Sequence, residues 1–181
     1  MSDARRLFFA LLPDRGVRRQ VAALQRELDA PGRPVKADNL HVTLVFLGQQ
    51  PAERVNDLCA LAAGLSFPRC RLRLDTLGVF RRAGVCWLGA AEVPRELVAF
   101  RALLAAALEA AEICFDQKEW KFHLTLYRGL RKPRPILHPV AIEWQLSGFH
   151  LIESVSTQSG VDYCSIGHWQ GRRAGSHPGF A

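Results

Sequence analysis

His41-Val42-Thr43-Leu44 recurs later in this chain of 181 residues as His123-Leu124-Thr125-Leu126. Each copy lies in an apolar run rich in β-branched and aromatic residues, and each run reaches a turn signal, Gly48 in the first and Gly129 in the second. Both runs therefore predict β-strands that end at these glycines. Because side chains alternate along a strand, each should bury one apolar face and present a His/Thr pair on the other.

The repeated pair carries a specific chemistry. His41 and Thr43 share one face of the first predicted strand, as His123 and Thr125 do in the second, whereas Phe46 falls on the opposite face and is expected in the core. A histidine moves protons near neutral pH, and a hydroxyl two residues away can donate a hydrogen bond to a phosphate oxygen. A single His-x-Thr is usually a structural pair. Two identical units suggest two imidazoles at one site, which can split a phosphodiester by general acid–base catalysis without a metal.

The surroundings of the two motifs also repeat. In the first half, a strand at 7–12 leads through a helix at about 17–28 and a Pro/Gly-rich break at 31–34 to the first motif. In the second half, a strand at 85–89 leads through a helix at about 94–111 to the second motif. The chain is therefore predicted to be a degenerate duplication of a strand–helix–strand unit.

The remaining periodic segments are expected to complete the two halves. Strands are predicted at 71–74 and 76–80 for the first half, at 142–146 and 149–152 for the second, and last at 161–166, with a further helix at 51–63. The expected fold class is α+β, with two pseudo-symmetric lobes, each a small, mostly antiparallel sheet with outer helices. A cleft between the lobes would let His41 and His123 face each other. Residues 1–170 are expected to form this one bilobal domain, and 171–181 a flexible tail.

The charge of the chain favours an anionic partner. Lys and Arg number 24 against 17 Asp and Glu, a formal net charge of +7. Such a balance points first to nucleic acid. A basic cluster that includes Arg128, Arg131 and Lys132 follows the second motif, where it could hold the phosphates of an RNA strand that leaves the cleft.

Cysteine usage and hydropathy narrow the class further. The five cysteines form no Cys-x-x-Cys pair, which disfavours both a disulfide framework and a zinc site. Reduced thiols predict a cytoplasmic protein. No apolar run approaches the roughly 20 residues of a membrane span. We expect no metal, no cofactor and no membrane contact, and a monomer.

Beyond these patterns, the chain resembles the 2H phosphoesterase superfamily. More narrowly, it is similar to the RNA 2′,3′-cyclic phosphodiesterases of bacteria and archaea, which are also called 2′-5′ RNA ligases. The resemblance extends over about residues 5–168. It rests on the segments 7–10, 39–44, 46–48, 123–128 and 149–154.

This resemblance implies a reaction and roles for the motif residues. It implies metal-independent opening of an RNA 2′,3′-cyclic phosphate to a 2′-phosphomonoester, with a weaker capacity to join RNA ends through a 2′-5′ bond. His41 would be the general acid and His123 the general base, although the sequence itself leaves this order open. Thr43 and Thr125 would donate hydrogen bonds to the phosphate.

The resemblance also implies substrate-binding residues outside the four motif positions. Arg128 matches a basic residue of the family, but strict alternation places it on the face opposite Thr125, so its role requires the strand to end or twist by Tyr127. An aromatic side chain near the cleft would stack the terminal base. Phe8 or Phe9 could do so, and the other of these two neighbours must then face the core.

Three other functions remain open from the sequence. One is the same chemistry on a small cyclic nucleotide or on ADP-ribose 1″,2″-cyclic phosphate. Another is an RNA-binding module without catalysis, which would not need two proton shuttles. A metal site built on His41 and His123 is disfavoured, because neither motif strand supplies a carboxylate ligand.

Overall fold

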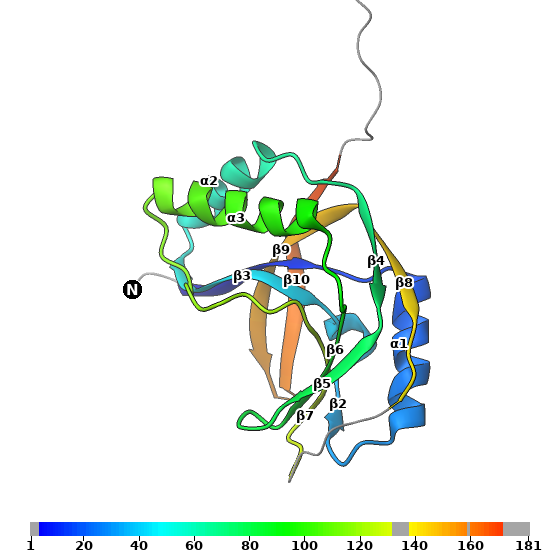
Figure 1. The fold of residues 1–181 in the computed structure, drawn as a ribbon. Coiled ribbons are helices and arrows are strands. Elements are labelled where there is room, and N and C mark those ends of the chain that lie inside the picture. Colours follow the sequence, from blue (N-terminus) through cyan, green and yellow to red (C-terminus); the bar gives the residue numbers. More distant parts are fainter. Residues whose placement is uncertain (1–3, 132–137, 159, 172–181) are drawn as a thin grey trace, which may run out of the picture.

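The computed structural model describes residues 4–131, 138–158 and 160–171, and it shows two main antiparallel sheets with helices outside them (Figure 1). The expected α+β class is thereby confirmed. Among the described residues, no helix has both the length and the hydropathy to cross a membrane. Most of the expected tail, 172–181, lies outside the described residues, as does Lys132.

The first sheet has the strand order β10-β9-β1-β3. Its strands are β1 (Ala4–Leu11), β3 (Val42–Pro51), β9 (Gly148–Thr157) and β10 (Gly160–Gln170). All of its neighbours pair antiparallel. The first motif strand, β3, therefore forms one edge of this sheet.

The second sheet has the order β2-β7-β6-β5 and carries the other motif strand. Its strands are β2 (Arg33–Pro34), β5 (Thr76–Phe80), β6 (Val85–Gly89) and β7 (Leu124–Arg128). A separate two-stranded sheet pairs β4 (Cys70–Leu74) with β8 (Ile142–Leu146). In both motifs the histidine precedes its strand by one residue, so neither imidazole lies inside a ladder.

In the part of the chain that the structure describes, three α-helices cover the outside of the sheets. They are α1 (Arg15–Leu28), α2 (Arg54–Ala63) and α3 (Arg95–Ala110), and a short 3-10 helix η1 (Ala37–Asn39) precedes β3. The Asp14 side chain caps α1 by accepting a hydrogen bond from the backbone N–H of Val17. The stripe predicted on α3 is buried, namely Leu97, Phe100, Leu104 and Leu108. In Figure 1, α2 and α3 lie together and α1 lies beside β8.

The expected assignment of strands to halves is wrong. Strand β9, expected to complete the second half, pairs with β1 of the first. Strand β5, expected in the first half, pairs with β6, because the tight connection 81–84 turns the chain directly back. Strand β4 pairs with β8 from the other half. Each half thus depends on strands from the other, and neither builds its sheet alone.

A β-bulge interrupts β3 within the first motif. Ala10 pairs with Thr43 and Phe9 with Val45, which leaves Leu44 as an extra residue. A bulge shifts the alternation of faces for the residues that follow it. Phe46 therefore faces the same side as Thr43 and packs on the small cluster there. The prediction that it lies on the opposite face, in the main core, is wrong.

A second bulge stands at the equivalent leucine of the other motif. Trp87 pairs with Thr125 and Cys86 with Tyr127, which leaves Leu126 as the extra residue. This shift carries Arg128 to the face of Thr125. For Arg128 to face the same side as Thr125, the strand had to end or twist by Tyr127. The bulge at Leu126, one residue before Tyr127, meets this requirement.

Of the two glycines that were expected to end the motif strands, only Gly129 does so. Gly129 follows β7 directly, as predicted, with φ of 72°. Strand β3 instead continues through Gly48 to Pro51. Gly48 has φ of 69° and lies at a further register shift opposite Leu7, a backbone conformation that glycine adopts without steric cost. Here the glycine permits an irregularity within the strand.

The two faces of the first sheet bury different sets of side chains. One face packs on the main core, which includes Phe9, Leu11 and Phe149. The opposite face carries a small cluster, called here the cleft-face cluster, in which Phe8, Ala10 and Ile152 are buried and Leu12, Phe46 and Tyr163 pack against them. This cluster forms the apolar floor next to the first motif.

A buried glutamine holds the β7 bulge in place. The Gln25 side chain on α1 donates hydrogen bonds to the carbonyls of Leu126, at 2.8 Å, and Val35, at 3.1 Å. The Tyr127 hydroxyl donates to the backbone carbonyl of Gln25. The backbone N–H of Val35 also donates to the Leu126 carbonyl, at 2.8 Å. Helix α1 and Val35, the residue that follows β2, therefore satisfy the carbonyl of the extra residue.

We predict that Gln25→Met lowers the free energy of unfolding by about 1–3 kcal/mol, because the Val35 carbonyl loses its side-chain donor and the Leu126 carbonyl keeps only the Val35 N–H. Urea unfolding followed by circular dichroism measures the change. Gln20→Met, an exposed position on the same helix, is the matched control and should stay within about 0.5 kcal/mol of the parent. Equal free energies for the Gln25 variant and the parent would contradict this role.

Candidate functional site

The segment that leads into the second motif runs along the first motif strand. The Trp120 indole N–H donates to the Thr43 carbonyl at 2.8 Å. The Asp116 backbone N–H donates to the Phe46 carbonyl at 2.8 Å, and the Gln50 side chain donates to the Cys114 carbonyl at 3.0 Å. These bonds fix the approach to His123 against β3, so the two motifs meet although they belong to different sheets.

The two motif histidines are held in the same way. Nδ1 of His41 lies 2.8 Å from the Asn39 carbonyl, and Nδ1 of His123 lies 2.7 Å from the Lys121 carbonyl. A carbonyl oxygen only accepts, so Nδ1 of each ring carries the hydrogen. In both rings Nε2 is then the atom that gains or loses a proton. Each histidine is thus oriented to act as a base when neutral and as an acid when charged.

The backbone that orients His41 is itself anchored across the sheet. The Asn39 side-chain amide donates to the Val161 carbonyl of β10 at 2.8 Å. This bond ties η1 to β10, and it also anchors the Asn39 carbonyl, which accepts the hydrogen bond from Nδ1–H of His41. Sequence reasoning gave Asn39 no role, because its partner lies in a strand far along the chain.

Aromatic rings contact both imidazoles. The His41 ring lies 5.0 Å from Phe8 and 4.8 Å from Tyr163, which meets it edge-on. The His123 ring meets Phe80 edge-on at 5.0 Å. These contacts restrict ring rotation and remove water from part of each imidazole.

Burial dominates the electrostatics of His41. It lowers the pKa of His41 from its ordinary value of 6.5 to about 4. The hydrogen bond to the Asn39 carbonyl acts in the opposite direction, and the positive charges of Arg128 and His123 lower the pKa further. His41 is therefore neutral at pH 7 while the site holds no anion.

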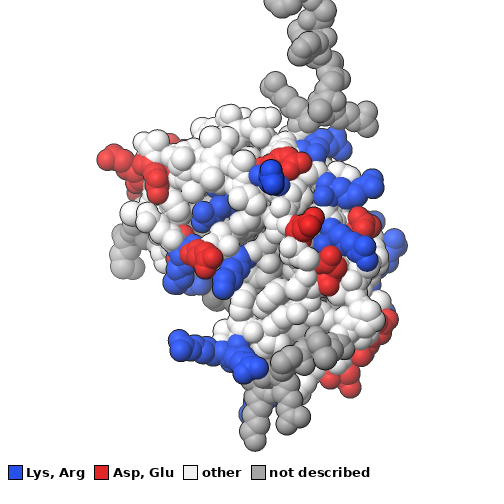
Figure 2. Space-filling view, viewed as in Figure 1, with Lys and Arg blue, Asp and Glu red and all other residues white. Residues whose placement is uncertain are grey.

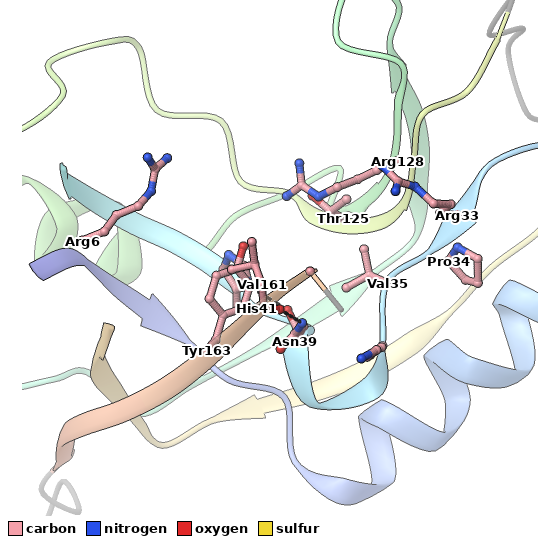
Figure 3. Close-up of a pocket in the computed structure, with 12 residues that line it drawn as sticks. Arg6, Arg33, Pro34, Val35, Asn39, His41, Thr125, Arg128, Val161 and Tyr163 are labelled. Atoms are coloured by element: carbon pink, nitrogen blue, oxygen red, sulfur yellow. Dashed lines mark hydrogen bonds between the residues drawn. The ribbon is translucent and has the colours of Figure 1, made fainter. Parts of the chain in front are cut away.

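A cavity of about 470 Å³ opens between the two sheets beside His41. Its lining comes from β1, from β2 and the following turn, from β7 and from β10: Arg6, Arg33, Pro34, Val35, Lys36, Asn39, His41, Thr125, Arg128, Gly160, Val161 and Tyr163. In Figure 3, Arg128 lies over Thr125 with Arg33 beside it, and Arg6 projects from the opposite side. Among the described residues, the lining includes four cationic side chains besides His41 and no carboxylate, so the cavity suits an anion.

The cavity brings together part of the predicted site. His41, Thr125 and Arg128 line it. Thr43 and His123 do not belong to its lining, although the charge of His123 reaches His41 strongly enough to lower its pKa. Thr43 and His123 are both half-buried rather than enclosed.

The expected aromatic and basic contacts are placed differently. Phe9 is fully buried in the main core, so the prediction that it contacts a substrate is wrong. Phe8 faces the cleft, as the alternative required, but only 3% of it is exposed and it lies against His41 and Tyr163. Arg131 is exposed and does not line the cavity.

Several lining residues went unnoticed in the sequence. Tyr163 presents its ring to His41 from β10, and Arg6, Arg33 and Lys36 supply charge. Alternation along the last predicted strand could have placed Tyr163 on one of its two faces, but nothing in the sequence showed that this strand pairs in the first sheet. Arg33 lay in a segment read only as a break.

No group of three or more His, Cys, Asp and Glu side chains arranged for a metal ion occurs among the described residues. The donors near His41 are imidazole, hydroxyl, guanidinium and backbone groups. Their chemistry favours phosphate oxygens over metal cations.

Comparison with known proteins shows the family of this chain. A family model described as LigT like Phosphoesterase matches residues 11–87. The RNA 2′,3′-cyclic phosphodiesterase of Escherichia coli (strain K12) is 32% identical over 173 residues, which cover 93% of this chain and 98% of that protein. The chain belongs to the LigT-like phosphoesterases. The resemblance drawn from the two motifs is thereby confirmed.

Further similarity extends over the whole LigT-like fold. The RNA 2′,3′-cyclic phosphodiesterase of Thermus thermophilus is 34% identical over 173 residues, which cover 87% of this chain and 86% of that protein. A crystal structure of Escherichia coli LigT complexed with 3′-AMP matches with a TM-score of 0.86 and 29% identity, covering 94% of this chain and all of that one. The likeness to LigT thus continues beyond residue 87 and includes the second motif.

The depressed pKa of His41 predicts an unusual titration. Followed by NMR, the imidazole of His41 should titrate near pH 4 in the free protein, and its midpoint should rise when inorganic phosphate binds, because an anion favours the imidazolium ion. His41→Gln identifies the resonance by removing it. Since the unfolded chain takes up the proton first, this group should also reduce stability as the pH falls from about 6.5 to about 4. A midpoint near 6.5 that phosphate leaves unchanged would contradict the geometry.

Proposed function

We propose that this LigT-like phosphoesterase hydrolyses RNA 2′,3′-cyclic phosphate ends to 2′-phosphomonoesters by a metal-independent mechanism of two histidines. One observation carries the proposal: both motif imidazoles donate Nδ1–H to a backbone carbonyl two residues back, which leaves both Nε2 atoms for proton transfer. The cationic cavity beside them supports an anionic substrate. The names of the relatives from Escherichia coli and Thermus thermophilus supply the substrate class.

The proposed reaction is one in-line displacement at phosphorus. Nε2 of His123 takes a proton from a water molecule as its oxygen attacks phosphorus. The bond from phosphorus to the ribose 3′ oxygen breaks, and Nε2 of His41 gives that oxygen a proton. The products are a 2′-phosphomonoester and a free 3′ hydroxyl, and solvent returns each histidine to its starting protonation state.

The phosphate is held by groups that donate hydrogen bonds. The Thr43 and Thr125 hydroxyls would donate to its non-bridging oxygens, and Arg128, turned toward Thr125 by the β7 bulge, would add a charged donor. These interactions strengthen as negative charge builds on phosphorus in the transition state.

Substrate binding would prepare His41 for its role. The free protein keeps His41 neutral, whereas a general acid must start protonated. A bound cyclic phosphate places a negative charge at this site, which raises the pKa of His41. Proton uptake would then accompany substrate binding, and His41 would be charged only when there is a leaving group to protonate.

Ligation would follow from the same groups. A 5′ hydroxyl of a second RNA end in place of water would attack the same phosphorus and produce a 2′-5′ phosphodiester. We further propose that the protein acts as a monomer in the cytoplasm. Its five cysteines are all free thiols in the structure, which suits a reducing compartment.

The first test is phosphorus NMR of a short RNA ending in a 2′,3′-cyclic phosphate, incubated with the protein in excess chelator. The cyclic signal should convert to a single 2′-phosphomonoester signal. His41→Ala and His123→Ala should each lower the rate by about 10²–10⁴-fold, because each removes one proton-transfer step.

His150→Ala is the matched control for this assay. His150 also lies on the first sheet, but its imidazole stacks on His168 instead of lining the cavity. The rate of hydrolysis by the His150→Ala variant should stay close to that of the parent protein. An unchanged cyclic signal with the parent protein would reject the RNA reaction and favour a small cyclic nucleotide or a binding role. Full activity in both motif variants would reject the mechanism.

A substrate with sulfur in place of the 3′ bridging oxygen separates the two histidines. A thiolate leaves without prior protonation, because thiols have a pKa near 8.5. His41→Ala should therefore recover most of its lost rate with this substrate, whereas His123→Ala should stay slow. The opposite pattern would exchange the assignments of acid and base.

A further inference from the structure

We propose that Arg33 and Lys36 bind the phosphate on the 5′ side of the nucleotide that carries the cyclic phosphate, so that the site selects an RNA end over a free nucleoside cyclic phosphate. The proposal rests on the proposed function. It assigns a binding site for a second phosphate and the direction in which the RNA strand leaves the catalytic groups.

The first argument is a surplus of positive charge. A cyclic phosphate diester carries one negative charge, and Arg128 with the threonine hydroxyls already provides for it. The same cavity is lined by Arg6, Arg33 and Lys36, all exposed. Within the described ranges, none of these three forms an ion pair. Several cations that form no ion pair and line one cavity, where the described residues supply no carboxylate, fit more than one phosphate.

The second argument is the placement of Arg33 and Lys36. Strand β2 pairs with β7 so that Arg33 stands directly beside Arg128. Adjacent strands are about 5 Å apart, so the two side chains start from neighbouring backbone positions and are long enough to reach successive phosphates of one strand. Figure 3 shows Arg33 next to Arg128 at the same end of the cavity. Lys36 follows β2 and lines the same cavity.

The third argument is that this segment is fixed in place. The backbone N–H of Val35 donates to Leu126, and the Val35 carbonyl accepts from Gln25. Pro34 pairs with Tyr127 and restricts the backbone further. The two cations therefore project from a backbone that is set by the same bonds that hold the β7 bulge.

Arg6 at the opposite end is less suited to this role. Its guanidinium carbon lies 4.9 Å from the centre of the Phe46 ring. This cation–π contact occupies one face of the guanidinium. In Figure 3 it approaches the cavity from the side away from Arg33 and Arg128.

A second arginine-rich cavity shows the contrast. It is lined by Arg71, Arg73 and Arg95, but also by Asp75 and Glu92. Arg73 pairs in register with Glu143 on β8. Figure 2 shows basic and acidic side chains interspersed over β4 and β8. Mixed charge of this kind is typical of a solvated surface and gives phosphates little net attraction.

The test compares kcat/KM for two substrates, adenosine 2′,3′-cyclic phosphate and a dinucleotide that ends in the same group. The parent protein should prefer the dinucleotide. Arg33→Gln and Lys36→Gln should each reduce the ratio of the two kcat/KM values by about tenfold, because each removes a charged donor to the second phosphate. Adenosine 2′,3′-cyclic phosphate with an added 5′-phosphate should regain part of the preference in the parent only.

Salt dependence gives a second readout. The slope of log kcat/KM against log salt for the dinucleotide should become shallower by about 0.7 in each variant, because one phosphate is no longer neutralised by a side chain. Arg71→Gln, which removes the same charge from the other cavity, is the matched control and should keep both the ratio and the slope.

Two results would overturn the proposal. One is equal kcat/KM for both substrates in the parent protein. The other is a loss of preference in Arg6→Gln that exceeds the loss in the Arg33 and Lys36 variants. That result would indicate that the RNA strand leaves the catalytic groups toward Arg6. Failure of the parent to hydrolyse either substrate would instead overturn the proposed function, and this inference with it.

Discussion

One extra residue in each motif ladder determines what faces the cleft. The bulges at Leu44 and Leu126 stand at the same position of the two repeated motifs. Each places the residue three positions after the threonine on the threonine's own face. In the first lobe that residue is Phe46, which joins the apolar floor, and in the second it is Arg128, which adds charge. The two motifs thus share a backbone irregularity and differ in the side chain that it presents.

The protonation state of the two imidazoles depends on their backbone hydrogen bonds and on the charges around them. Backbone carbonyls orient both imidazoles, so no acidic side chain is needed to select the tautomer. Burial and neighbouring positive charge keep His41 neutral until an anion arrives. The same cations that attract a phosphate therefore discourage protonation of His41 in its absence, and a bound phosphate offsets their effect.

Local patterns predicted the elements well and their partners poorly. The helical stripe on α3 and the two motif strands follow from periodicity, which depends only on near neighbours in the chain. The pairing of β9 with β1 and of β4 with β8 depends on contacts between distant segments, for which one sequence carries no local signal. Arg33 shows the same limit, because a two-residue strand is too short for any periodicity.

The sequence by itself determined the family and the proposed chemistry, through two repeated His-x-Thr-Leu units and a net positive charge, because residue types and their spacing are local properties. The tertiary structure decided which side chains share the cleft. It buried Phe9 and brought Tyr163, Arg33 and Lys36 to the cavity that His41 also lines. The physical reason is that bulges and strand exchange change faces and neighbours through hydrogen bonds between segments far apart in the chain, and only the folded molecule forms those bonds.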